Sequence, residues 1–120
     1  MNDKSAVGKA GEDIALEYLQ KLGLRLRDRN WRVGHLEIDI VMEDAECVRF
    51  VEVKTLSDDV GFDPFEEITD LKMKRLIRSA KAYANIKNIT CEMVFDVVGI
   101  VLGKQGAEVV YLPDAFRVIN

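Results

Sequence analysis

The order of apolar and polar residues along the 120-residue chain predicts two helices and five strands. Apolar residues recur with helical spacing over residues 5–22 and 69–85. Gly23 suits the end of the first helix, and Thr69 suits the N-cap of the second. Apolar or alternating runs predict strands over residues 24–31, 36–42, 47–55, 89–102 and 108–112. This order of elements predicts an α/β fold with a mixed sheet.

Length and composition predict a single domain spanning residues 1–120. Apolar residues make up 48% of the chain and charged residues 32%, which is typical of a globular protein and not of a disordered one. No window reaches the roughly 18 consecutive apolar residues of a membrane span, and residues 1–5 lack the apolar core of a signal peptide. We therefore expect a cytoplasmic protein with no membrane partner. Cys47 and Cys91 lie in apolar runs, which predicts two buried, reduced thiols.

Charge is unevenly distributed along the chain. The net charge of −4 argues against a protein that binds nucleic acid through its overall charge. Basic residues nevertheless gather in residues 21–32 and 72–81, and acidic residues gather in a loop predicted over residues 56–67. Helical periodicity places most cations of the second stretch opposite the apolar stripe. The two stretches are therefore candidate phosphate-binding surfaces, and their candidate DNA contacts are Arg29, Arg32, Lys74, Arg75 and Arg78.

Charged residues inside two apolar strands are the strongest candidates for chemistry. Side-chain alternation places Glu37 and Asp39 on one face of their strand, and Glu52 and Lys54 on one face of the next. A short turn joins the strands into a hairpin, so we expect Asp39 and Glu52 to lie within a few ångströms of each other. Close carboxylates repel unless a cation lies between them, and Mg²⁺ prefers oxygen ligands. With a lysine that can orient a water, this set is suited to phosphodiester hydrolysis.

Two helical residues fit the same site. Glu12 flanks the apolar stripe of the first helix, and its small neighbours Gly8, one turn earlier, and Ala15, one turn later, would let that helix approach the sheet. Lys72 lies on the flank of the second helix's apolar stripe, where it can lean toward the site. Spacing alone also allows a structural interpretation, in which the strand charges form ion pairs at a sheet edge and Glu12 is exposed. A lone His35 in a loop is assigned no role.

Several short motifs occur together in one order along the chain. They are Gly8-Lys9-Ala10-Gly11-Glu12, Arg29-Asn30-Trp31-Arg32, Glu37-Ile38-Asp39-Ile40, Phe50-Val51-Glu52-Val53-Lys54-Thr55, Thr69-x-x-Lys72 and Phe95-Asp96-Val97-Val98. Over nearly its whole length the chain resembles the YraN-like bacterial proteins, a family similar to the archaeal Holliday-junction resolvases. The resemblance implies a restriction-endonuclease-like fold, a mixed β-sheet flanked by helices, with a PD-(D/E)xK site.

The resemblance also implies roles for individual residues. The implied catalytic set is Asp39, Glu52, Lys54, Glu12, Glu37 and Lys72, and the implied metal ligands are Asp39, Glu52, Glu12 and the Val53 carbonyl. The ion would be Mg²⁺, with Mn²⁺ as an alternative. The chain departs from the family pattern at Leu36, where Gly is usual, at Leu56, where Arg is frequent, and before Asp39, where no Pro stands. The first two departures bear on DNA affinity more than on metal binding.

We therefore expect a Mg²⁺-dependent DNA endonuclease-like protein that acts on branched or recombination DNA. By analogy with resolvases, which cut two strands, we expect a homodimer. Two alternatives remain open. One is a protein of nuclease fold that binds nucleic acid without cutting it, which the net acidity and Leu56 favour. The other is a scaffold module in which the strand charges are ion pairs and no metal binds.

Overall fold

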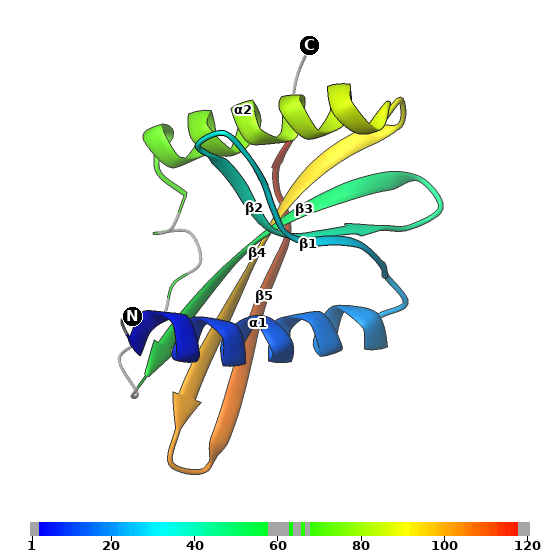
Figure 1. Cartoon of the computed structure of the whole chain (residues 1–120). Coiled ribbons are helices and arrows are strands. Elements are labelled where there is room, and N and C mark those ends of the chain that lie inside the picture. The colour runs from blue at the N-terminus through cyan, green and yellow to red at the C-terminus, as the bar shows by residue number, and fades with distance from the viewer. Residues whose placement is uncertain (1–2, 58–62, 64–65, 67, 118–120) are drawn as a thin grey trace.

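The computed structural model describes residues 3–57, 63, 66 and 68–117 (Figure 1). The elements are α1 (Asp3–Lys21), β1 (Arg25–Val33), β2 (Leu36–Glu43), β3 (Cys47–Ser57), α2 (Asp70–Lys87), β4 (Glu92–Gly103) and β5 (Gly106–Arg117). The predicted number and order of helices and strands are confirmed. The largest difference is β5, which is longer than predicted. Of the predicted acidic loop, Leu56 and Ser57 belong to β3, and most of the rest lies outside the described residues.

The strands form one five-stranded sheet in the order β1-β2-β3-β4-β5. Strands β3 and β4 are parallel, and every other neighbouring pair is antiparallel. A parallel pair needs a crossover connection, and α2 lies within the connection between β3 and β4. The two helices lie on opposite sides of the twisted sheet (Figure 1). This mixed α/β sheet flanked by helices confirms the predicted fold class and is consistent with the restriction-endonuclease-like fold.

Each helix covers its own apolar cluster. On the α2 side, Tyr83 packs against Phe50 of β3 with their ring centroids 5.6 Å apart. On the α1 side, Leu19 and Val51 belong to the second cluster. Phe50 and Val51 are adjacent in β3 and face opposite helices, as the alternation of a strand requires. The polar residues that follow them in β3 lie beyond this core.

The caps of the helices fix where α2 begins and α1 ends. Thr69 Oγ1 accepts a hydrogen bond from Lys72 N at 3.2 Å, which confirms Thr69 as the N-cap of α2. Gly23 has φ +99°, and Leu24 N donates to Leu19 O at 3.2 Å, which closes α1 as predicted. The Thr69 cap therefore places Lys72 in the first turn of α2.

Helix α1 approaches the sheet most closely at Gly11. A Cβ atom on Gly11 would lie 1.8 Å from Thr55 Oγ1, whereas a Cβ on Gly8 would meet nothing within 4 Å. Of the two small residues predicted to permit the approach, Ala15 is fully buried against the sheet, whereas Gly8 is not at the contact, because α1 meets β3 about one turn later. Glu12 directly follows the contact, so the missing side chain of Gly11 brings Glu12 close to β3.

Both edge strands are interrupted. The pairing of β1 with β2 shifts register between Leu26 and Asp28, and Asn30 has φ +52°. The pairing of β4 with β5 shifts between Phe95 and Val97, and Asp114 of β5 has φ +53°. The β1 strand therefore departs from regular geometry near its middle, and β5 does so toward its C-terminal end.

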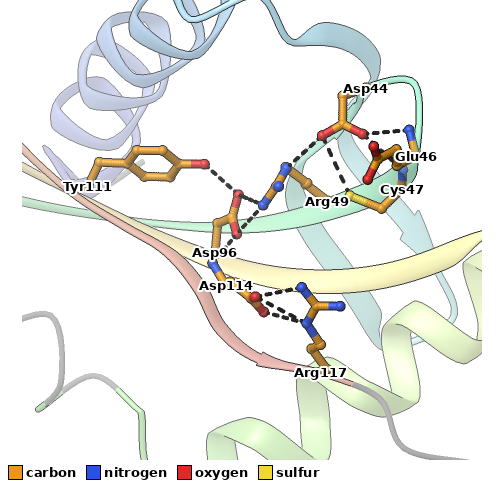
Figure 2. A network of polar contacts seen from close by, with 8 residues as sticks. All are labelled: Asp44, Glu46, Cys47, Arg49, Asp96, Tyr111, Asp114 and Arg117. Atoms are coloured by element: carbon orange, nitrogen blue, oxygen red, sulfur yellow. Dashed lines mark hydrogen bonds and ion pairs between the residues drawn. The ribbon is translucent and has the colours of Figure 1, made fainter.

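A buried polar network joins β3, β4 and β5 (Figure 2). Asp96 is 1% exposed and accepts hydrogen bonds from Arg49 Nη1 at 3.1 Å, Tyr111 Oη at 2.7 Å and Asp114 N at 2.7 Å. Burial raises the pKa of Asp96, and these hydrogen bonds oppose the rise. Arg49 also pairs with Asp44 at 3.2 Å. The buried carboxylate is therefore fully engaged by protein groups, as a structural role requires.

The two cysteines lie in different environments. Cys47 is buried, as predicted, and burial raises the pKa of its thiol to about 11. Cys91 is exposed, so the prediction of a second buried thiol is wrong. Its apolar sequence context was misleading because β4 begins after it, at Glu92. Neither helix of the described chain combines the length and apolar character that a membrane crossing requires.

Candidate functional site

The candidate site lies where the pairing between β2 and β3 ends. The ladder runs from Glu43 opposite Val48 to Ile40 opposite Val51. Beyond that pair, Val53 N donates a hydrogen bond of 2.9 Å to Asp39 Oδ2. The Asp39 carboxylate therefore bridges the two strands at the end of their ladder. The register continues to place Asp39 beside the segment that carries Glu52, as the hairpin predicted.

A cleft of about 1050 Å³ opens at this point between α1, the β1–β2 hairpin, β3 and α2. Its walls carry the whole predicted catalytic set and Val53. These residues are Glu12, Glu37, Asp39, Glu52, Val53, Lys54 and Lys72. Of the five predicted DNA contacts, Arg29, Arg32 and Arg75 line the cleft, and Lys74 and Arg78 do not. Residues from five separate motifs are thus brought together around one space.

Asp39 carries the strongest electrostatic signal of the site. Burial, followed by repulsion from Glu52, raises the pKa of Asp39 to about 7. The Val53 N–H opposes this rise, whereas the charges of Glu12 and Glu37 add to it. Four carboxylates therefore act on one another in the cleft. Within the described part of the chain, no basic side chain forms an ion pair with Asp39.

Lys72 reaches from α2 to the acid of β3. Its Nζ lies 2.9 Å from Glu52 Oε2, and the side chains of both residues are 19% exposed. The Thr69 cap fixes the turn that carries Lys72, so the start of α2 positions this ammonium group. The position predicted for Lys72, leaning toward the site, is confirmed. The ion pair balances the charge of Glu52 in the described state.

Arg29 links β1 to α1 beside the site. Its Nε lies 3.5 Å from Glu12 Oε1, and its Nη2 lies 2.6 Å from Asp13 Oδ1 and donates to Lys9 O at 3.4 Å. In the same manner Arg32 pairs with Glu37 at 3.2 Å, on the more exposed rim. Both arginines therefore engage carboxylates in this structure.

The chemistry of the donor set fits a hard divalent cation such as Mg²⁺. The acidic side chains offer oxygen atoms only, and the half-buried Asp39 carboxylate has a raised pKa that a bound cation would lower. No three His, Cys, Asp or Glu side chains among the described residues already surround a common metal position. Glu52 and Glu12 are engaged by Lys72 and Arg29 instead. A bound ion would therefore share or replace these basic partners.

Some cleft residues had no assigned role in the sequence. Lys9, Asn30 and Thr55 line the cleft and belong to the quoted motifs, which was the available signal. His35 also lines it, although a lone histidine in a turn gave no indication of that position. The hairpin between β1 and β2 brings His35 to the cleft. The geometry of that hairpin cannot be inferred from the presence of a histidine.

Comparison with known proteins identifies the family. The sequence model of the Uncharacterised protein family UPF0102 matches residues 11–100. A UPF0102 protein of Bacteroides thetaiotaomicron is 35% identical over 97% of this chain and 96% of its own length. UPF0102 proteins of Nitrosococcus oceani, 40% identical over 92% of this chain and 91% of their own length, and of Chloroherpeton thalassium, 37% identical over 99% of both, are similar as well. The chain therefore belongs to the UPF0102 family, the YraN family that its motifs resemble.

Proposed function

We propose that this protein is a metal-dependent DNA endonuclease that hydrolyses phosphodiester bonds with Mg²⁺, or with Mn²⁺ in its place. One observation carries the proposal, namely the convergence of Asp39, Glu52 and Lys54 in a cleft at the end of the β2–β3 ladder. Half-buried carboxylates beside cationic side chains suit a site that holds both a metal ion and a phosphate. The substrate we favour is branched or recombination DNA.

The proposed function assigns a role to each of the main cleft residues. Asp39, Glu52, Glu12 and the Val53 carbonyl would hold the ion, which supplies positive charge to the phosphoryl oxygens and lowers the pKa of water. Lys54 positions the attacking water by a hydrogen bond. The water oxygen forms a bond to phosphorus as the bond to the leaving sugar oxygen breaks, and the products are a phosphate monoester and a hydroxyl group.

The neighbouring charges support this arrangement. Glu37 adds to the negative field at Asp39 and is held by Arg32. Lys72 holds Glu52 until the ion binds, and its ammonium group then faces the phosphate. Arg29, Arg32, Lys74, Arg75 and Arg78 would contact the DNA backbone. A homodimer would supply the two sites needed to cut two strands.

A second function is favoured by the two ion pairs. Lys72 pairs with Glu52, and Arg29 pairs with Glu12. Because these acids already have basic partners, the cleft also suits a site that binds nucleic acid without a metal. Such a protein would bind DNA and yield no products in either Mg²⁺ or Mn²⁺. One cleavage assay in the presence of each metal therefore distinguishes the two functions.

The test combines cleavage with thermal unfolding. We expect Asp39→Ala and Glu52→Ala to lower Mg²⁺-dependent cleavage of a four-way junction by at least about 100-fold, because the ion loses a ligand. Mg²⁺ should raise the melting temperature of the wild type and not of Asp39→Ala. Lys54→Ala should lose cleavage and keep the Mg²⁺-induced rise. Glu17→Ala, on the outer surface of α1, is the control. Unchanged cleavage by folded Asp39→Ala would contradict the proposal.

A further inference from the structure

Helix α2 carries a row of cations at intervals of three residues. The members are Lys72, Arg75, Arg78 and Lys81, and we call them the basic row. Each step of three residues advances about 4.5 Å along a helix and turns about 60° around its axis. The row therefore winds from the cleft, where Lys72 is 19% exposed and Arg75 lines the wall, to the outer surface at Arg78 and Lys81.

The outer part of the basic row consists of Arg75, Arg78 and Lys81. These three side chains form no ion pair with any residue that the structure describes. The helix itself has Asp70 as its one acidic residue and six basic residues, although the whole chain has a net charge of −4. Positive charge is therefore concentrated on this helix of an acidic protein, which favours a local anionic partner.

We propose that the basic row binds the phosphate backbone of one strand of a DNA duplex that leaves the cleft and crosses α2 obliquely. This inference rests on the proposed function, because the row begins at the cleft assigned to phosphodiester hydrolysis. Lys81 lies nine positions after Lys72, so the row extends about 13 Å along the helix axis and turns about 180° around it. Lys72 therefore faces the cleft and Lys81 the opposite side of α2, so a strand that meets the whole row must cross the helix, with a phosphate about every 3.4 Å of duplex axis.

The surroundings favour a duplex over a single strand. Proteins that bind single strands usually stack bases on aromatic side chains. None of the described residues that line the cleft is Phe, Tyr or Trp. The aromatic residue of α2, Tyr83, is buried against Trp31 and Phe50. Cations that contact only the backbone also give binding that is independent of base sequence.

The test measures DNA affinity against salt concentration. Fluorescence anisotropy would follow a 20-base-pair duplex in Ca²⁺ without Mg²⁺, for the wild type and for Arg78→Gln/Lys81→Gln. Each lost phosphate contact lowers the slope of log affinity against log salt by about 0.9, so the double variant should lose about 1.8. We expect its affinity to fall on the order of tenfold. The matched control is Lys104→Gln/Arg117→Gln, which removes two exposed cations of the β4–β5 hairpin and should leave the slope unchanged.

The outcomes distinguish this inference from the proposed function. An unchanged slope for Arg78→Gln/Lys81→Gln, an equal loss in the control, or tighter binding of a single strand or an RNA duplex would overturn the inference. Wild-type cleavage rates for the double variant at both low and high salt would also overturn the inference. That result would leave the proposed nuclease function intact. A duplex bound through the basic row and never cleaved would refute the nuclease and leave the row in place.

Discussion

Asp39 illustrates how one residue can join structure to chemistry. Its carboxylate accepts the Val53 N–H at the end of the β2–β3 ladder, and its pKa is raised to about 7 by burial and by Glu52. The same side chain therefore links two strands through a hydrogen bond and carries a charge whose partial burial is destabilising at neutral pH. A bound cation would offset the cost of the charge and leave the hydrogen bond in place.

Asp39→Asn should stabilise the metal-free protein at high pH. The folded-state pKa lies above the ordinary value of 3.8, so the folded protein keeps a proton that the unfolded chain gives up. Wild-type stability therefore falls as pH rises from about 4 to about 7, and Asn has no such dependence. We expect the advantage of Asp39→Asn to grow by up to about 4 kcal/mol between pH 4 and pH 8. Urea unfolding in EDTA at pH 4, 6 and 8 measures it, and a constant difference would contradict the argument.

The sequence predicted which residues line the cleft better than it predicted the ion pairs that they form. Alternation along β2 and β3 is a local property, so it predicted that Asp39 and Glu52 lie together. The partners of Arg29 depend on how far α1 lies from β1, which no local pattern encodes. Its contacts with Glu12 and Asp13 therefore came only from the structure.

At the scale of elements, the docking of α1 on β3 sets the geometry of the site. The contact between Gly11 and Thr55 has no room for a side chain, and Glu12 follows it directly. The sequence analysis assigned the approach to Gly8 and Ala15, and no local pattern indicated that the tightest contact falls at Gly11. The position of that contact depends on the tilt of the helix over the sheet, which follows from packing in three dimensions.

Gly11→Ala should destabilise the protein, and Gly8→Ala should not. The new methyl group on residue 11 would overlap Thr55, and relieving it requires α1 to move, at a cost of about 2 kcal/mol or more. At residue 8 the methyl group meets nothing within 4 Å, and alanine favours the helix by about 0.5–1 kcal/mol. Urea unfolding of both variants measures the difference. Equal stabilities would show that α1 does not press on β3 at Gly11.

Strand lengths were less predictable at the edges of the sheet. The β1 strand is polar and largely exposed, so its apolar pattern fades before its end at Val33. Pairing with β2 continues to Val33 opposite Leu36, because backbone hydrogen bonds do not depend on the side chains. The buried strands β2 and β3 were predicted to within two residues at each end, whereas β4 begins three residues later than predicted, at Glu92.

At the scale of the whole molecule, the Asp96 network joins the neighbouring strands β3, β4 and β5 (Figure 2). Arg49 of β3, Asp96 of β4 and Tyr111 of β5 meet in it. The Phe95-Asp96 motif therefore has a structural explanation that is independent of the cleft.

Arg49→Met should be strongly destabilising, by about 3–5 kcal/mol at pH 8, because it leaves the Asp96 carboxylate buried without its cation. The cost should shrink as pH falls, because burial already raises the pKa of Asp96 and a protonated acid needs no cation. Arg117→Met is the control. Arg117 pairs with Asp114 and Glu92 at the surface, where an ion pair contributes at most about 1 kcal/mol. Equal costs for the two variants in chemical denaturation would contradict this account.

The interrupted edge strands limit how copies of this protein can associate. An uninterrupted edge offers a regular series of backbone donors and acceptors that another chain can extend. The left-handed Asn30 in β1 and Asp114 in β5 break that series on both sides of the sheet. A second copy must therefore dock through side chains or helices, and a continuous intermolecular sheet is disfavoured. The same feature protects the protein from edge-to-edge aggregation as its concentration rises.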